Sequence, residues 1–290
     1  ERAGAGIVRE VRPAVHDRIA GAAERMIQQR PTLSIDRMRT AIRSGQIEVY
    51  MQPQCSIEDG RLLGVEALSR WRHPDYGLVF PDAFIPFVTS VGLIDELTDH
   101  VIASTLDALQ AWDRQGLHLS ASVTIASSTL NRVDLPEQVQ HACEVRNLSI
   151  KRLTLEITET GSVHKPTQSL DVISRLFLAG IDIALDDFGT GHATLSSLHK
   201  LPFSGIKLDR SFVSVMRHDQ EARAIVQSTC ELAAKLQLHC IAEGVEEFQT
   251  LSMLRDFGCT AYQGYWLAPP MPADRFLAWA REEFPDQVPQ

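Results

Sequence analysis

Residues 181–191 read IDIALDDFGTG: a short apolar run ends in two acidic residues, and a glycine-containing turn follows. Runs of this kind recur along the chain and alternate with longer segments in which apolar residues have helical spacing. Polar residues follow five of the runs, namely Glu66, Glu156, Asp186 with Asp187, Lys207 and Glu243. Near-continuous apolar strands that alternate with helices are typical of a parallel sheet covered on both faces.

The positions of these polar residues favour a barrel over an open, doubly wound sheet. In a barrel of parallel strands the carboxyl ends of all strands converge on one mouth, where active sites lie. In an open sheet the same ends spread along an edge, and only neighbours at the switch point meet. The sequence therefore predicts an α/β fold, a TIM-like (β/α)8 barrel, with these side chains gathered at its mouth.

Several carboxylates gathered in this way need positive charge between them to stay ionised. Oxygen ligands without thiolate or suitably spaced histidine favour hard cations, here Mg²⁺ or Mn²⁺. Two ions bridged by Asp186 or Asp187 would suit phosphodiester hydrolysis, with Lys207 holding the attacking water. A single acid at a strand end is more often a helix cap, but the whole set at equivalent strand ends predicts a metal site.

The overall composition narrows the class of protein. The chain has 290 residues, of which 44% are hydrophobic, so a large buried core is expected. Its net charge of −9 argues against DNA or RNA as a partner. The five cysteines are scattered and lack a CxxC pair, which indicates neither a disulfide framework nor a thiolate zinc site. We therefore expect a reducing, cytoplasmic location, with no membrane segment in this chain.

The first residues differ from the rest of the chain. Apolar residues between Ile7 and Ala22 recur at spacings of three and four, which predicts an amphipathic helix that ends before Pro31. We assign residues 1–34 to an N-terminal helix or linker of a longer protein, and residues 35–290 to the barrel domain. This helix either packs on the barrel or carries a signal from an upstream sensory or regulatory domain.

Eight short motifs extend this pattern over more than 200 residues. They are YMQP (50–53), VEALSRW (65–71), FIP (84–86), LEITET (155–160), DDFGTG (186–191), IKLDRSF (206–212), AEGVEE (242–247) and QGYWLAPP (263–270). In this ordered set the chain resembles the EAL-domain family of cyclic di-GMP phosphodiesterases. The resemblance implies a barrel whose first strand runs antiparallel to the others. It also implies hydrolysis of cyclic di-GMP to linear pGpG with two Mg²⁺ or Mn²⁺ ions, and a homodimer.

The resemblance also implies roles for individual residues. The metal-binding positions would be Glu66, Thr124, Glu156, Asp186, Asp187 and Glu243. Lys207 would orient the attacking water, Glu243 would serve as its base, and Glu246 would support Glu243. Glu159 would anchor the loop after Asp187 and couple dimerisation to activity. The ligand-contacting positions would be Gln52, Arg70, Asp209 and Gln263.

Two departures from the family pattern leave the activity open. Thr124 stands where the family carries a metal-binding asparagine, and a hydroxyl is a weaker ligand than an amide oxygen. Residues 87–90 read FVTS where LAEE is usual. The sequence is thus compatible with a phosphodiesterase of full or reduced activity, with a catalytically inactive cyclic di-GMP receptor, or with an interaction scaffold. The surviving acids favour the enzyme.

Overall fold

The computed structural model describes residues 33–158, 166–190, 198 and 201–288. These residues divide into two compact units. The smaller unit holds the described residues up to Glu48 together with Ser69–Leu97, and the barrel unit holds Val49–Leu68 and Thr98 onward. The predicted helix between residues 1 and 34 lies almost wholly outside the described residues, so the boundary at residue 35 stays a prediction.

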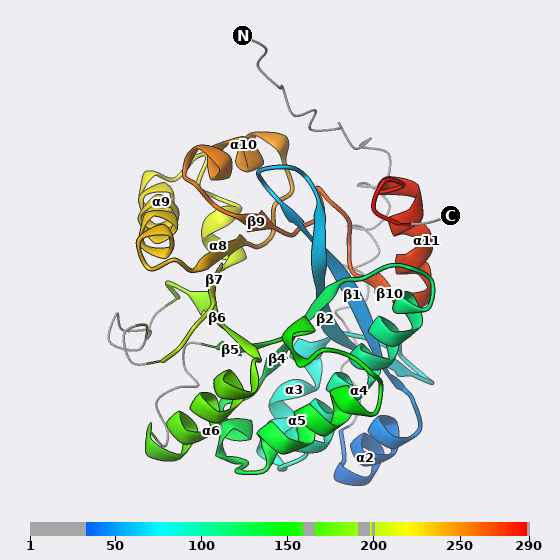
Figure 1. The fold of residues 1–290 in the computed structure, drawn as a ribbon. Helices are drawn as coiled ribbons and strands as arrows, with labels where there is room; N and C mark the ends of the chain where they lie inside the picture. Colours follow the sequence, from blue (N-terminus) through cyan, green and yellow to red (C-terminus); the bar gives the residue numbers. More distant parts are fainter. Residues whose placement is uncertain (1–32, 159–165, 191–197, 199–200, 289–290) are drawn as a thin grey trace. The chain divides into compact units, whose positions relative to one another are not determined.

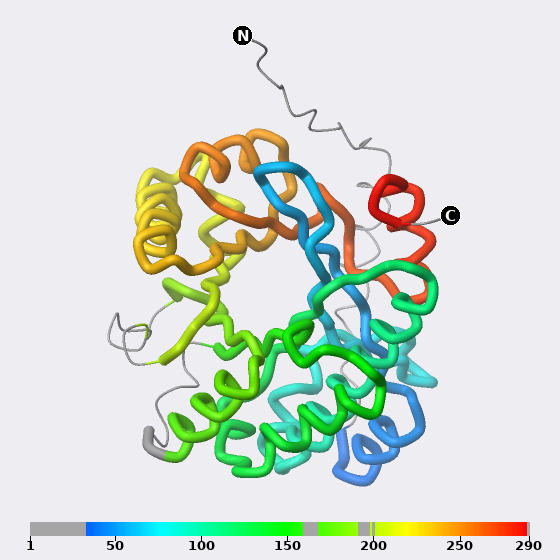
Figure 2. The backbone as a smooth tube through the Cα atoms, in the orientation of Figure 1, coloured from blue at the N-terminus to red at the C-terminus, as the bar shows by residue number. Residues whose placement is uncertain are grey.

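The barrel unit is built on a closed ring of strands (Figures 1 and 2). Its strands are β1 (Ile47–Ser56), β2 (Leu62–His73), β4 (Ser120–Ile125), β5 (Leu153–Thr158), β6 (Asp182–Phe188), β7 (Gly205–Leu208), β8 (His239–Ala242) and β9 (Ala261–Tyr262). Around the ring the order is β1-β9-β8-β7-β6-β5-β4-β2, and pairing of β1 with β2 closes it. A short strand, β10 (Met271–Pro272), adds to β1. The predicted TIM-like barrel is confirmed.

The direction of β1 differs from that of the other strands. Neighbours from β2 through β4 to β9 pair in parallel. Strand β1 instead pairs antiparallel with β9, where Cys55 lies opposite Tyr262. The expectation of an antiparallel first strand is therefore correct. The carboxyl ends of the parallel strands consequently open at one end of the barrel.

Helices cover the outside of the ring, as Figure 1 shows for α5, α6 and α9 to α11. Their bounds are α5 (Leu135–Glu144), α6 (Pro166–Ala179), α8 (Arg210–Val213), α9 (Gln220–Lys235), α10 (Phe248–Asp256) and α11 (Ala273–Glu283), with 3-10 turns η3 (Ser127–Asn131) and η4 (Ile150–Arg152). Helix α9 is capped by the preceding residue, Asp219, whose side chain accepts hydrogen bonds from the backbone of Glu221 and Ala222. It packs against β7 and β8 through Val226, Cys230 and Ala233.

Strand β6 is irregular at its two successive acids, Asp186 and Asp187. The register with β7 shifts between Leu185 and Phe188, and Asp187 has a left-handed φ of 56°. A carboxylate oxygen of Asp186 accepts a hydrogen bond of 3.0 Å from the Asp187 backbone, which compensates for the interrupted ladder. Adjacent residues of a regular strand point to opposite faces, so this irregularity is what lets both acids lie near the mouth.

The smaller unit contains α2 (Ile35–Arg43), β3 (Gly77–Val79), the turn η2 (Pro81–Ala83), α3 (Ile85–Ser90) and the start of α4 (Ile94–Asp113). Trp71 is fully buried and meets Phe84 edge to face, with 6.1 Å between the ring centroids. Arg39 and Arg43 of α2 form ion pairs of 3.3 and 3.1 Å with Glu96. The aromatic core therefore contributes more to the stability of the unit than these ion pairs, which are exposed to solvent.

Substitution of Gly264 tests how closely the backbone packs near the barrel mouth. A Cβ at this position would overlap the backbone of Val245, whereas a Cβ at Gly60, which also has positive φ (70°), would meet nothing within 4 Å. We expect Gly264→Ala to lower the free energy of unfolding by more than about 3 kcal/mol and Gly60→Ala by about 1 kcal/mol. Equal losses in urea denaturation would contradict the packing described.

Candidate active site

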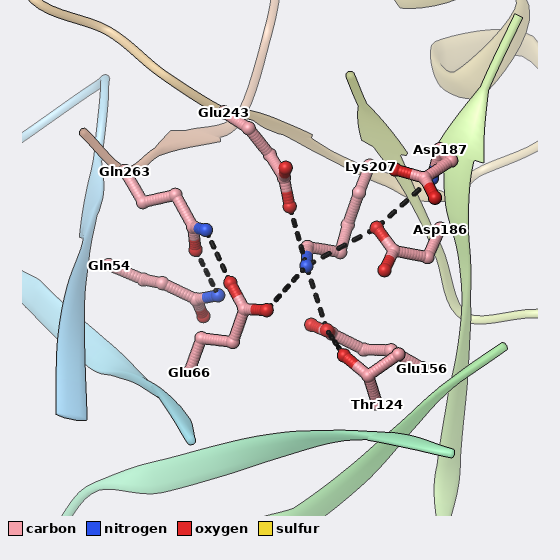
Figure 3. Close-up of polar contacts among 9 residues, drawn as sticks. All are labelled: Gln54, Glu66, Thr124, Glu156, Asp186, Asp187, Lys207, Glu243 and Gln263. Atoms are coloured by element: carbon pink, nitrogen blue, oxygen red, sulfur yellow. Dashed lines mark hydrogen bonds and ion pairs between the residues drawn. The ribbon is translucent and has the colours of Figure 1, made fainter. Parts of the chain in front are cut away.

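The ammonium group of Lys207 lies at the centre of the barrel mouth among four carboxylates (Figure 3). Its Nζ atom is 2.6 Å from Glu243 Oε1, 2.7 Å from Glu156 Oε2, 3.2 Å from Glu66 Oε1 and 3.3 Å from Asp186 Oδ1. Glu66 lies within β2 where that strand pairs with β4, Glu156 and Asp186 lie in the second halves of β5 and β6, and Glu243 directly follows β8. Lys207 comes from β7. The structure therefore brings together the strand-end residues that the sequence singled out.

This cluster is buried. Lys207 and Glu156 are fully inaccessible to solvent, and Glu66 and Asp186 are 5% and 6% exposed. Four ionised carboxylates against one ammonium would leave an excess of negative charge in a region of low dielectric, which costs free energy. The cluster therefore needs further positive charge or protons.

The pKa values respond to this imbalance. Burial raises the pKa of Glu156 to about 8, although the Lys207 ammonium opposes the shift. Burial likewise raises the pKa of Glu243 well above its ordinary value. Burial by itself would lower the pKa of Lys207, but the surrounding carboxylates raise it well above 10.5. Lys207 is thus a permanent cation, while protons occupy carboxylates when no other cation is bound.

Asp187 lies beside Asp186 at the edge of the cluster (Figure 3). Burial, followed by repulsion from Asp186 and Asp209, raises its pKa to about 6. Asp209 follows β7 and caps α8 through a 3.0 Å hydrogen bond from the Ser211 backbone. A second group of acids therefore adjoins the ring around Lys207.

The donor set fits divalent cations. Glu156 Oε1 is buried and accepts a hydrogen bond from none of the described residues, which is costly for a carboxylate oxygen. The ring is lined by carboxylate oxygens, the ligands preferred by Mg²⁺ and Mn²⁺. Bound cations would supply the positive charge that the cluster lacks and would give Glu156 Oε1 a partner.

Thr124 lies on β4 opposite Glu156 of β5. Its Oγ1 donates a hydrogen bond of 3.2 Å to Glu156 Oε2, the oxygen that also contacts Lys207. The hydroxyl thus serves as a donor to an acid of the cluster.

Two glutamines extend the cluster toward β1. Gln263 Nε2 donates to Glu66 Oε2, and Gln54 Nε2 donates to Gln263 Oε1 over 2.8 Å (Figure 3). Gln54 was missed in the sequence analysis. It lies two residues from the predicted site residue Gln52, and such residues share a strand face, so the spacing could have revealed it. The side chains of Gln54 and Gln263 are both buried.

The remaining predicted residues are more dispersed. Glu246 is exposed in the segment after β8. Arg70 belongs to the smaller unit, where it is buried and its guanidinium lies 5.0 Å from the ring centroid of Phe80. Glu159 lies outside the described residues. The roles assigned to these three side chains stay predictions.

Comparison with known proteins identifies relatives over most of the chain. The family model of the EAL domain matches residues 35–270. Cyclic di-GMP phosphodiesterase NbdA of Pseudomonas aeruginosa is 37% identical over 82% of this chain and 30% of its own length. Cyclic di-GMP phosphodiesterase RocR of the same organism is 34% identical over 81% of this chain and 60% of its own. The chain thus spans less than two thirds of either relative.

Solved structures agree with this assignment of the fold. A complex of the PaMucR phosphodiesterase with c-di-GMP superposes with a TM-score of 0.79 at 32% identity, covering 83% of this chain and 98% of that one. The EAL enzyme Bd1971, bound to cAMP and cyclic di-GMP, gives 0.81 at 27% identity, covering 90% and 71%.

Substitution of Glu156, the acid whose Oε1 accepts no hydrogen bond from the described residues, tests whether the cluster binds a metal. We expect Glu156→Gln to weaken Mn²⁺ binding at least tenfold, about 1.4 kcal/mol, because the amide contributes less charge and only one oxygen. Isothermal titration calorimetry measures the binding. The exposed Glu282→Gln serves as the matched control and should bind as the unaltered protein does. Equal affinity in Glu156→Gln would contradict a metal site at this carboxylate.

Proposed function

Because the chain belongs to the EAL domain family, we propose that its barrel binds cyclic di-GMP and hydrolyses it to pGpG with the help of two divalent cations. The observation that carries this proposal is the buried ring of carboxylates around Lys207 at the barrel mouth. The names of the relatives NbdA and RocR, which are cyclic di-GMP phosphodiesterases, support the choice of substrate.

The acids divide into two neighbouring sets. Glu66, Glu156 and Asp186, with the Thr124 hydroxyl, would hold one Mg²⁺ or Mn²⁺, and Asp186, Asp187 and Glu243 would hold the second. Bound there, the ions would polarise the phosphodiester oxygens and make water a stronger nucleophile. Gln263 orients Glu66 through its side-chain amide, and Gln54 in turn orients Gln263.

Lys207 and Glu243 would have different roles toward the attacking water: Lys207 would position it and Glu243 would accept its proton. The raised pKa of Lys207 keeps its ammonium protonated, so it donates hydrogen bonds and positions the water oxygen without taking its proton. Glu243 adjoins Lys207 at 2.6 Å. Bound cations would favour its ionised form, and the carboxylate would then accept a proton from the water. As the water oxygen bonds to phosphorus, the bond from phosphorus to O3′ breaks and the leaving O3′ gains a proton.

The wider features of the family complete the proposal. Gln52, Arg70, Asp209 and Gln263 would contact the ligand, Glu246 would support Glu243, and Glu159 would link the site to a homodimer. An upstream sensory or regulatory domain and a cytoplasmic location are likewise proposed. Among the described residues, no helix combines the length and apolarity needed to cross a membrane.

The contact made by Thr124 favours a second candidate function, that of a receptor that binds cyclic di-GMP without cutting it. The Thr124 hydroxyl donates a hydrogen bond to Glu156 Oε2, whereas an asparagine amide oxygen would coordinate a cation. Loss of one neutral ligand weakens metal binding at the first position, although the surrounding acids are unchanged. The enzyme remains the better supported function, because the other acids and Lys207 are in place.

Incubation of the purified protein with cyclic di-GMP and Mn²⁺ separates the two functions. We expect pGpG to accumulate, as followed by chromatography, and Glu243→Gln to slow its formation at least a hundredfold because the base is lost. Calorimetric binding of cyclic di-GMP without any pGpG would establish the receptor instead. Absence of both binding and product would contradict either function.

Exchange of Thr124 tests the metal ligand directly. We expect Thr124→Asn to lower the Mn²⁺ concentration needed for half-maximal turnover about tenfold, equivalent to 1.4 kcal/mol, because an amide oxygen is a better ligand. Thr124→Val, which has nearly the same shape but no hydroxyl, is the matched control and should require at least as much Mn²⁺ as the unaltered protein. An unchanged metal requirement in Thr124→Asn would show that residue 124 lies outside the metal site.

A further inference from the structure

Three cysteine sulfurs converge on the outer side of the barrel wall, away from the carboxylate ring. Cys230 belongs to α9, Cys240 to β8, and Cys259 to the turn before β9, and their Sγ atoms all lie within 4.8 Å of one another. We call these three residues the thiol cluster. In the sequence these cysteines are scattered and indicate no thiolate zinc site, because sequence spacing does not show that α9 packs on β8.

The two faces of β8 serve different purposes. Alternate residues of a strand point to opposite faces, so Cys240 and Ala242 share the outer face, whereas Glu243 at the strand end turns to the mouth. Cys230 lies on the buried face of α9, four residues after Val226. Contact between α9 and β8 brings the two sulfurs to 3.8 Å.

Cys259 is held in place by backbone contacts. Its Sγ lies 3.2 Å from the carbonyl oxygen of Cys240 and 3.4 Å from that of Ala261. The hydroxyl of Thr260 fixes the same turn, since it donates to the Cys240 carbonyl over 2.8 Å and accepts from the Cys240 backbone over 2.9 Å. The three thiols are free and at most 5% exposed. They form a reduced set of sulfur atoms with fixed positions.

We propose that the thiol cluster binds one soft, thiophilic metal cation, represented by Cu(I), through its three sulfur atoms. Sulfur ligands select soft cations over the hard cations of the carboxylate ring. A metal about 2.3 Å from three sulfurs in one plane requires sulfur separations of about 4.0 Å. The observed separations of 3.8 Å and at most 4.8 Å match this with little movement of the backbone.

The number of ligands distinguishes this site from a structural zinc site. Zinc in such sites is almost always bound by four protein ligands. Within the described part of the chain, the group of metal-binding side chains at this place consists of the three cysteines. Burial of all three disfavours water as a fourth ligand. Each thiol that binds releases its proton to the buffer, and copper stays Cu(I), so no oxidant or reductant is consumed.

Copper titration under anaerobic conditions tests the proposal independently of cyclic di-GMP. The protein, kept reduced with a phosphine, is titrated with Cu(I) against a chromophoric chelator. We expect one bound equivalent, and at least tenfold weaker binding in Cys230→Ser, Cys240→Ser and Cys259→Ser. Cys143→Ser alters a buried cysteine on α5 that is outside the thiol cluster, and it should bind copper as the unaltered protein does.

Two measurements on the unaltered protein keep the test decisive if a variant fails to fold. X-ray absorption at the copper edge should show three sulfur neighbours, and Cu(I) should raise the melting temperature because it binds the folded state. The proposal is overturned if the chelator keeps all the copper, or if copper has two sulfur neighbours or nitrogen and oxygen neighbours. It is also overturned if copper lowers the melting temperature, or if the three cluster variants bind it as tightly as Cys143→Ser.

Discussion

The contact between the Lys207 ammonium and four carboxylates is the constraint on which the rest of the site depends. A buried cation stripped of water is unfavourable by several kcal/mol unless ionised partners surround it, and removal of a single partner from a buried pair typically costs about 3–5 kcal/mol. Here the acids outnumber the lysine, and all of these groups are at least four-fifths buried (side-chain exposures of 1 to 17%). The cluster is therefore short of positive charge, which weakens stability and favours the binding of the divalent cations proposed above.

The parallel strands of the barrel hold the four acids in position around Lys207. The four acids belong to four strands or directly follow them, and the parallel register brings them to the same rim: Glu66 on β2, Glu156 on β5, Asp186 on β6 and Glu243 after β8. At β6 the regular ladder gives way, with Asp187 in a left-handed conformation. This departure from ideal strand geometry lies where two successive acids occur, as is common for strained residues at functional sites.

Much of this could be predicted from the sequence. Alternating apolar runs and helices indicated the barrel, and the residues after the runs indicated Glu66, Glu156, Asp186, Lys207 and Glu243. Individual side-chain contacts outside this set of strand-end residues could not be predicted. The hydrogen bond from Gln54 to Gln263 and the meeting of Cys230, Cys240 and Cys259 arise from packing of particular faces, which periodicity does not specify. Likewise, the sequence shows a glycine-containing turn after the two acids, but not that the left-handed backbone begins at Asp187 (φ 56°), before Gly189 (φ 100°).

The proposed function requires that the carboxylates at the mouth hold two divalent cations against a cyclic dinucleotide. A crystal structure grown with Mn²⁺ and cyclic di-GMP, with anomalous scattering recorded at the manganese edge, tests it most directly. We expect two anomalous peaks that flank Asp186, with Glu156 Oε1 directed at one of them and a phosphate between both ions. Density for the dinucleotide elsewhere, or a mouth without anomalous signal in which Lys207 keeps all four ion pairs, would contradict it.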